Sequence, residues 1–307
     1  MSLLVTHLVI GVKDDQEVLS EMETIEHTYI ETNGIKLHVV QAGPKEGEVV
    51  LLLHGFPEFW YGWDKQITAL ASQGYRVWAP DQRGYNLSDK PKKIRDYQMK
   101  YLTADIAGLI KASGKEKVYL VGHDWGGIVA WRVAREYPDL LHKLIILNAP
   151  HEQAMAKQIL QHPLQILKSS YIGFFQLRGV PERLFSVSDW EPAVKALKAT
   201  SQKGTFSEED LQRYRSAWSQ PRAMRSMINW YRALVRYPSS QKVPERVKVP
   251  TFVIWGAKDQ FLGQELASKS LEYCDNGRGR LIGEATHWIQ HEKAYQINEW
   301  MIDFMKE

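Results

Sequence analysis

The chain has 307 residues, of which 44% are hydrophobic and 24% charged, and its formal net charge is +3. This composition is ordinary for a globular protein with a sizeable core and excludes an intrinsically disordered chain. No basic stripe accompanies the small positive charge, which gives no reason to expect nucleic acid as a partner. The single cysteine, Cys274, cannot form an internal disulfide, so we expect a cytoplasmic protein.

The first two dozen residues differ from the rest of the chain. Residues 3–12 are apolar, but this run contains His7 and lacks the basic start and the small-residue cleavage site of a signal peptide. It is also too short to span a bilayer, so we expect no membrane anchor there. We predict that residues 1–24 form an N-terminal extension packed on the core, and we assign it no function.

Strand and helix patterns alternate after this extension. Residues 28–30 and 35–40 flank Asn33-Gly34 and predict a hairpin, because an Asn-Gly pair supplies the positive φ angles of a tight turn. The other apolar runs are short and continuous, as in strands buried on both faces. We expect these strands at 49–53, 75–80, 118–121, 141–147, 251–255 and 280–282, and helices at 63–72, 100–112, 128–137, 263–273 and 292–305.

One long segment interrupts this alternation. From about residue 152 to 241 the pattern is helical, rich in aromatic residues and broken by prolines. The alternating strands and helices on either side imply a mostly parallel sheet with helices on both faces. We therefore predict an α/β core of residues 1–151 and 242–307. Residues 152–241 are predicted to be an inserted helical cap over the carboxyl ends of the strands, where such sheets bind ligands.

A glycine-flanked aspartate stands between the strand at 118–121 and the helix that follows it. The spacing Gly122-x-Asp124-x-Gly126 is that of a strand-to-helix elbow, in which a sharp turn raises one side chain above the sheet. A serine there would indicate acyl chemistry, whereas an aspartate forms an alkyl ester and attacks saturated carbon. The alternative is an aspartate that only caps the helix. We predict that Asp124 is a covalent nucleophile.

Hydrolysis of such an ester needs a general base and a residue that orients it. His287 follows the last expected strand, and Asp259 follows the strand before it. The chain order nucleophile, acid, histidine is that of a hydrolase triad on an α/β sheet. Asn148, at the end of another strand, cannot supply the charge of the acid. We therefore predict a triad of Asp124, Asp259 and His287.

The run His54-Gly55-Phe56-Pro57 follows the strand at 49–53 and occupies the position at which an oxyanion hole is expected. When water attacks the ester, the carbonyl oxygen becomes an anion that needs two backbone donors. The amides of Phe56 and Trp125 are predicted to supply them. The bond between Phe56 and Pro57 is a candidate for the cis form, because an X-Pro bond in a tight turn is where that form occurs.

Five short motifs together resemble the epoxide hydrolases of the α/β-hydrolase family, and the resemblance extends from about residue 25 to the C-terminus. They are His-Gly-Phe-Pro, Asp-Gln-Arg-Gly-Tyr-x-x-Ser, Gly-His-Asp-Trp-Gly-Gly, Trp-Gly-x-x-Asp and Thr-His-Trp. One departure is Asn86, where this loop pattern more often has glycine. The family places two tyrosines in the cap, and Tyr171 and Tyr231 match its motifs. The resemblance implies that these two phenols hold and protonate the epoxide oxygen.

The resemblance implies an enzyme that converts epoxides to vicinal diols without a cofactor or metal ion. We expect Phe174, Phe175, Leu262 and Trp288 to line an apolar substrate pocket, in a protein that is a monomer or a homodimer. Haloalkane and haloacetate dehalogenases share the aspartate elbow and would be identified by halide release. A non-catalytic receptor with the same fold is a third alternative, and it would turn over no epoxide.

Overall fold

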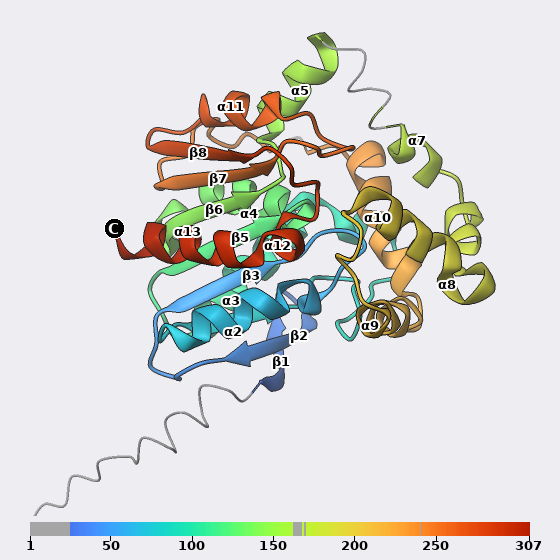
Figure 1. Ribbon diagram of the computed structural model, residues 1–307, viewed down its shortest axis with the longest axis horizontal. Helices are drawn as coiled ribbons and strands as arrows, with labels where there is room; N and C mark the ends of the chain where they lie inside the picture. Colours follow the sequence, from blue (N-terminus) through green and yellow to red (C-terminus); the bar gives the residue numbers. More distant parts are fainter. Residues whose placement is uncertain (1–24, 162–167, 169, 240) are drawn as a thin grey trace, which may run out of the picture.

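An eight-stranded sheet forms the centre of the protein (Figure 1). The computed structural model describes residues 25–161, 168, 170–239 and 241–307, so the predicted N-terminal extension, residues 1–24, lies outside the described residues. The strands are β1 (Glu26–Thr32), β2 (Ile35–Ala42), β3 (Val49–Leu53), β4 (Arg76–Pro80), β5 (Val118–His123), β6 (Leu141–Leu147), β7 (Thr251–Gly256) and β8 (Gly277–Ile282).

The order of these strands is β1-β2-β4-β3-β5-β6-β7-β8. Strand β2 runs antiparallel to both its neighbours, and all the other pairs are parallel. Asn33 and Gly34 join β1 to β2 with φ angles of 47° and 73°, which confirms the predicted hairpin and its Asn-Gly turn. The mostly parallel sheet predicted from the alternating pattern is likewise confirmed.

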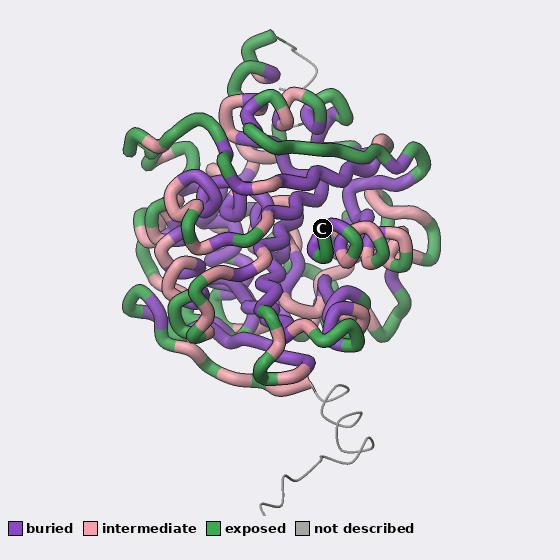
Figure 2. Tube along the Cα trace, turned by 90° about the vertical axis from the view of Figure 1, so that its left-hand side faces the viewer, coloured by how far each residue is buried: buried purple, intermediate pink, exposed green. Residues whose placement is uncertain are grey.

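Helices cover both faces of the sheet. Successive residues of a strand point to opposite faces, so each buried strand packs against helices on both sides. Val50 and Leu52 belong to the buried cluster formed with α2 and α13, whereas Leu51 and Leu53 belong to the cluster formed with α3, α4 and α11. The strands are accordingly buried along the centre of the molecule (Figure 2). The covering helices are α2 (Asp64–Ser72), α3 (Met99–Ala112), α4 (Trp125–Glu136), α11 (Glu265–Leu271), α12 (Ile289–Glu292) and α13 (Ala294–Lys306), with short 3₁₀ helices at Trp60–Trp63, Ile94–Tyr97 and Pro138–Leu140.

The segment between β6 and β7 is helical in its described residues. Helix α5 contacts the core, because Gln158 donates a hydrogen bond of 2.5 Å to Glu265 of α11. The next four helices gather on one side of the sheet (Figure 1). They rest on the loops of the core, where Trp218 donates to the carbonyl oxygen of Pro57 at 2.6 Å and Trp230 donates to that of Arg83 at 2.9 Å. The helices of this segment are α5 (Glu152–Gln161), α7 (Tyr171–Phe175), α8 (Val180–Thr200), α9 (Glu208–Trp218) and α10 (Ala223–Arg236).

Two helices depart from a simple continuous form. Helix α8 has a kink, where Ser188, Asp189 and Trp190 have φ angles of 49°, 54° and 65°. The helix expected at 292–305 begins at Ala294 instead, because Lys293 has non-helical angles and separates it from the short α12. Within the described part of the chain, no helix is both long enough and apolar enough to cross a membrane.

Candidate active site

The site is built around a strained turn between β5 and α4. Asp124 has a φ of 49° and a ψ of −121°, a backbone conformation that L residues adopt only when the surrounding structure enforces it. The turn is tight enough to require glycine on both sides. A Cβ added to Gly126 would lie 2.1 Å from the carbonyl oxygen of Leu53, and one added to Gly122 would lie 2.5 Å from the carbonyl oxygen of Gly126. The Asp124 side chain is thereby held above the sheet.

The structure brings the three predicted triad residues together. His287, between β8 and α12, has its Nδ1 atom 2.7 Å from Oδ2 of Asp259, which follows β7. Its other ring nitrogen, Nε2, lies 3.6 Å from Oδ2 of Asp124. The side chains of His287 and Asp259 are 3% and 0% exposed, whereas that of Asp124 is 16% exposed. His287 and Asp259 are therefore buried behind Asp124, whose carboxylate is the most exposed of the three side chains.

The buried carboxylates control the charge of His287. Burial alone would lower the pKa of this histidine, but the charge and hydrogen bond of Asp259 outweigh it, and Asp124 and Glu58 add to their effect. The pKa of His287 is raised from 6.5 to about 9. Burial also acts against the charged form of Asp259, yet the attraction of His287 holds the pKa of Asp259 below its usual range. The pair is therefore an imidazolium and a carboxylate at neutral pH.

Neighbouring donors fix the position of Asp259. The Asn148 side chain donates to Oδ2 at 2.6 Å, while the backbone amides of Phe261 and Leu262 donate to Oδ1 at 2.8 Å and 3.0 Å. Both carboxylate oxygens are therefore occupied, and Asp259 keeps one orientation toward His287. Asn148, which cannot replace the acid, acts in this structure as its support.

The loop after β3 supplies a backbone donor to the nucleophile. The amide of Phe56 donates to Oδ1 of Asp124 at 2.8 Å, and a Cβ on Gly55 would lie 2.4 Å from the Asp124 Cβ atom. The peptide bond between Phe56 and Pro57 is cis, as predicted. His54 is buried and accepts a hydrogen bond of 3.1 Å from the amide of Gln82, so it braces this loop.

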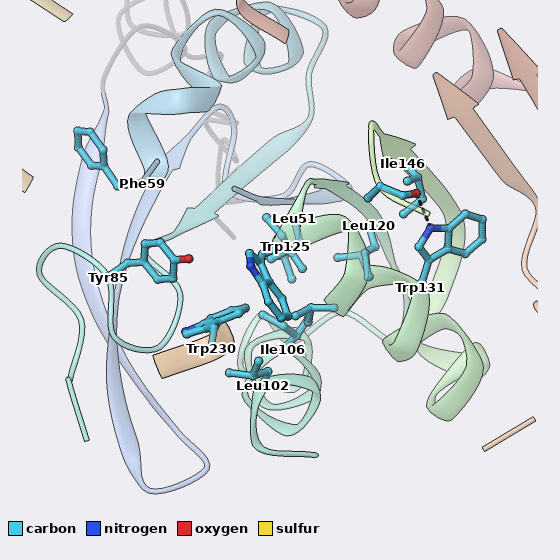
Figure 3. Close-up of a cluster of buried hydrophobic side chains, with 14 of the residues drawn as sticks. Leu51, Phe59, Tyr85, Leu102, Ile106, Leu120, Trp125, Trp131, Ile146 and Trp230 are labelled. Carbon is cyan, nitrogen blue, oxygen red and sulfur yellow. Dashed lines mark hydrogen bonds between the residues drawn. The ribbon is translucent and has the colours of Figure 1, made fainter. Parts of the chain in front are cut away.

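Trp125 opens helix α4 directly after Asp124, so its amide belongs to the free N-terminal turn of that helix. Its indole ring lies in the apolar cluster beside Trp230, with the two ring centroids 5.5 Å apart (Figure 3). The ring is thus part of the core, and it also packs edge-on against Tyr231 with ring centroids 5.0 Å apart, so Trp125 meets the site through its side chain as well as its backbone.

The two predicted cap tyrosines, on α7 and α10, line the same cavity as Asp124. The ring centroids of Tyr171 and Tyr231 are 5.7 Å apart, and Tyr231 also packs edge-on against Phe56 at 5.3 Å. Burial raises the pKa of the Tyr171 phenol, and the charges of Asp124 and Asp259 raise it further. Burial likewise raises the pKa of Tyr231, with Tyr171 and Asp124 adding to the shift. Both phenols are therefore neutral donors at any ordinary pH.

A cavity of about 230 Å³ lies between the cap and these residues, and both tyrosines, Asp124 and His287 line it. Of the four predicted lining residues, Phe174, Phe175 and Trp288 contribute to its wall. Leu262 does not, and this prediction is wrong. Leu262 is buried in the apolar core, and the preceding residue, Phe261, lines the cavity instead, with its ring against those of His287 and Tyr171. Sequence reasoning also missed Phe185 and Met224, because the kinked α8 and the amphipathic α10 gave no signal of which residues face inward.

A buried carboxylate near the site was also missed. Glu58 is 1% exposed and lies 3.1 Å from Nδ1 of His123, 2.6 Å from Nε2 of His291 and 2.8 Å from the hydroxyl of Tyr214. Burial opposes its charge, but the two histidines hold the pKa of Glu58 well below its usual range. His123 in turn donates from Nε2 to the carbonyl oxygen of His287 at 2.8 Å. The signal in the sequence that could have identified Glu58 was its position directly after the His54-Gly55-Phe56-Pro57 motif.

No group of three or more His, Cys, Asp or Glu side chains that could hold a metal ion occurs in the part of the chain that the structure describes. Of the described residues that line the cavity, Asp124 and His287 are the charged ones, and the rest are apolar apart from the two tyrosines and Thr200. The arrangement thus combines an elbow carboxylate, a histidine paired with a second, buried carboxylate, and two neutral phenols.

This fold and arrangement define a class of protein. The family model described as the α/β hydrolase fold matches residues 48–294, and the chain therefore belongs to the α/β-hydrolase family. Among its relatives, the chain is 46% identical to the AB hydrolase superfamily protein YfhM of Bacillus subtilis, over 93% of this chain and 99% of that protein. It is 38% identical to epoxide hydrolase 4 of Homo sapiens, over 94% of this chain and 81% of that protein.

Solved structures show the same likeness. A variant of an epoxide hydrolase from Bacillus megaterium, in complex with its diol product, matches with a TM-score of 0.85 and 31% identity, over 91% of this chain and 100% of that one. The epoxide hydrolase VrEH1 from Vigna radiata matches with a TM-score of 0.79 and 30% identity, over 93% of this chain and 98% of that one.

Proposed function

We propose that this protein is an epoxide hydrolase, which converts an uncharged epoxide to a vicinal diol through an ester on Asp124. The observation that carries the proposal is the cavity that joins the elbow carboxylate to two buried, neutral phenols. An epoxide needs both kinds of group, because a nucleophile must attack its carbon while its oxygen gains a proton. The relatives named epoxide hydrolases support the same activity.

In the first step, Asp124 attacks a ring carbon of the epoxide. Its Oδ1 atom is occupied by the amide of Phe56, so Oδ2 is the oxygen free to attack. The C–O bond of the ring breaks, and its electron pair moves to the epoxide oxygen. Tyr171 and Tyr231 hydrogen-bond this oxygen and supply its proton, which makes the leaving alkoxide a hydroxyl group. The product of this step is an alkyl ester of Asp124.

In the second step, water attacks the carbonyl carbon of the ester. His287 removes a proton from this water, and Asp259 stabilises the imidazolium that forms. The carbonyl oxygen becomes an anion, which the amides of Phe56 and Trp125 bind. The anion then collapses and breaks the bond to the alkoxide, which gains the proton of the newly added hydroxyl, so that the diol leaves and the Asp124 carboxylate is restored.

The charge of Asp124, which adds to the larger effect of Asp259, helps to set the protonation state of His287 in each step. In the free enzyme the pKa of His287 is about 9, and the charge of Asp124 is one of its causes. Formation of the ester removes this charge, so the pKa of His287 falls. The histidine can then lose its proton, which balances the proton that restores the phenol used in the first step, and act as a base in the second step only. A base is not needed earlier, because a carboxylate attacks without losing a proton.

The phenols favour this function over the dehalogenase alternative. A halide leaves as a weak base and needs no proton, whereas an alkoxide that stays attached to the product does. Two neutral phenols on the wall of the same largely apolar cavity therefore suit an epoxide better. Among the described residues, the wall of the cavity contains no lysine or arginine, which favours substrates without a carboxylate, such as styrene oxide.

A single turnover in heavy-oxygen water tests the covalent mechanism. With enzyme in excess over styrene oxide, the first diol should carry ordinary oxygen, because that oxygen comes from Asp124. Later turnovers should carry the heavy isotope, since the water oxygen enters the carboxylate during each hydrolysis. Heavy oxygen in the diol from the first turnover would mean direct attack by water. Release of halide from a chloroalkane without epoxide turnover would establish the dehalogenase instead.

A further inference from the structure

A group of exposed apolar side chains lies on the outer part of the cap. Twelve large apolar side chains are exposed among the described residues, and four of them fall within residues 177–187. These four are called the cap stripe here: Leu177, Val180, Leu184 and Val187, each between 49% and 51% exposed. Val180, Leu184 and Val187 recur at intervals of four and three, so they share one face of the first part of α8. Clustering of this kind indicates an interaction surface.

Unpaired positive charge accompanies the cap stripe. Arg178 and Arg183 are exposed, and neither guanidinium has a hydrogen bond or ion pair within the described residues. The carboxylate in the same segment, Glu182, is 13% exposed and is paired with Arg232 at 2.7 Å. Residues 152–241 contain 13 Lys and Arg against 7 Asp and Glu, a net charge of +6, while the whole chain carries +3. The positive charge of the protein is thus concentrated in the cap.

The opposite side of the same segment lines the cavity of the proposed active site. Phe185, which follows Leu184, lines the cavity and packs on Phe175 with ring centroids 6.0 Å apart. Further along α8, Ala193 and Leu197 line the cavity as well. The helix that carries the cap stripe outside is therefore a wall of the apolar cavity inside, and it lies on the side of the cap away from the sheet (Figure 1).

We propose that the cap stripe binds the surface of membranes that contain acidic phospholipids. The apolar side chains would enter the boundary between headgroups and acyl chains, and Arg178 and Arg183 would contact the lipid phosphates. A second copy of this chain fits less well, because a two-fold interface places the same patch on both partners. The unpaired arginines of the two copies would then face one another, without an unpaired carboxylate in the segment to balance them. An acidic surface has the complementary charge.

This docking would give the site access to apolar epoxides dissolved in the bilayer, and that consequence rests on the proposed function. The binding itself does not, because it can be measured without substrate. The full-length protein is sedimented with vesicles of phosphatidylcholine, with and without phosphatidylglycerol, at low and at high salt. We expect binding to the acidic vesicles that weakens as salt rises, since dissolved ions screen exposed charges.

Matched variants separate this surface from general positive charge. The double variant Arg178→Gln, Arg183→Gln should bind acidic vesicles about thirtyfold more weakly. Leu184→Ser combined with Val187→Ser should also weaken binding and should reduce its residual strength at high salt. Lys45→Gln with Lys111→Gln removes the same charge from exposed sites on the core, and Tyr295→Ser removes an apolar side chain that is 84% exposed on α13. Both controls should bind as the wild type does.

Three results would overturn the proposal: no binding to acidic vesicles, equal binding to neutral ones, or equal losses in the core controls. Conversion of a dimer to a monomer by the Leu184→Ser, Val187→Ser variant would show that a second copy covers the stripe, and the membrane proposal would be wrong. Turnover of dissolved styrene oxide should stay unchanged in all these variants, which shows that they fold. If the wild type bound acidic vesicles but turned over no epoxide, only the proposed function would fail.

Discussion

Replacing Asp259 by Asn tests the proposed second step most directly. The change keeps the size of the side chain and removes the charge that holds His287 protonated. The rise of the His287 pKa from 6.5 to about 9 corresponds to a net stabilisation of the buried imidazolium of about 3 kcal/mol. Burial opposes this stabilisation, while Asp124 and Glu58 add to the larger effect of Asp259, so about 3 kcal/mol gives the order of magnitude for Asp259. Hydrolysis of the ester should therefore slow by on the order of 100-fold.

Rapid mixing with an epoxide, followed by intact-mass measurement, separates the two steps. The Asp259→Asn variant should form the Asp124 ester at nearly the normal rate and then accumulate it. Asp81→Asn is a matched control, because Asp81 is also buried and lies 2.7 Å from a histidine, His38, outside the cavity. The control should not accumulate ester. If ester hydrolysis in Asp259→Asn were as fast as in the wild type, or if both steps slowed equally, the assignment of Asp259 would be refuted.

Three further predictions follow from the same geometry. Tyr171→Phe and Tyr231→Phe should each slow ester formation about 30- to 1000-fold, because one of two donors is lost while the ring packing stays; full turnover in the double variant, measured by diol formation, would contradict this role. The pKa of His287 is higher in the folded protein than in the unfolded chain, so its proton stabilises the folded state. This contribution is fully present below pH 6.5 and is lost as the pH rises through about 9. The difference in urea unfolding free energy between wild type and His287→Gln should therefore fall by about 3 kcal/mol across that range, and a constant difference would count against it. Gly126→Ala should prevent stable folding, since its Cβ would lie 2.1 Å from the carbonyl oxygen of Leu53, whereas Gly283→Ala, with no atom within 4 Å, should leave the melting temperature unchanged.

The sequence by itself determined the features that depend on local chemistry. The Asn33-Gly34 turn, the continuous apolar strands and the glycines around Asp124 each have a local steric or periodic cause, so they could be predicted without a partner in space. The order of Asp124, Asp259 and His287 was also readable, because parallel strands bring their carboxyl ends to one edge of the sheet. Motif resemblance added Tyr171 and Tyr231, which periodicity alone could not distinguish from core tyrosines.

Tertiary structure alone decided which neighbouring residue faces the cavity. Leu262 and Phe261 are adjacent and both apolar, but in the fold Leu262 packs in the core while Phe261 packs on His287 and Tyr171 and lines the cavity. The same holds for Glu58, whose burial depends on His291 and Tyr214, residues more than 150 positions away in the chain. The pKa of His287 also arises only in the fold, because it is the balance between burial and charges from distant segments. Such balances are set by packing in three dimensions, and a linear pattern does not contain them.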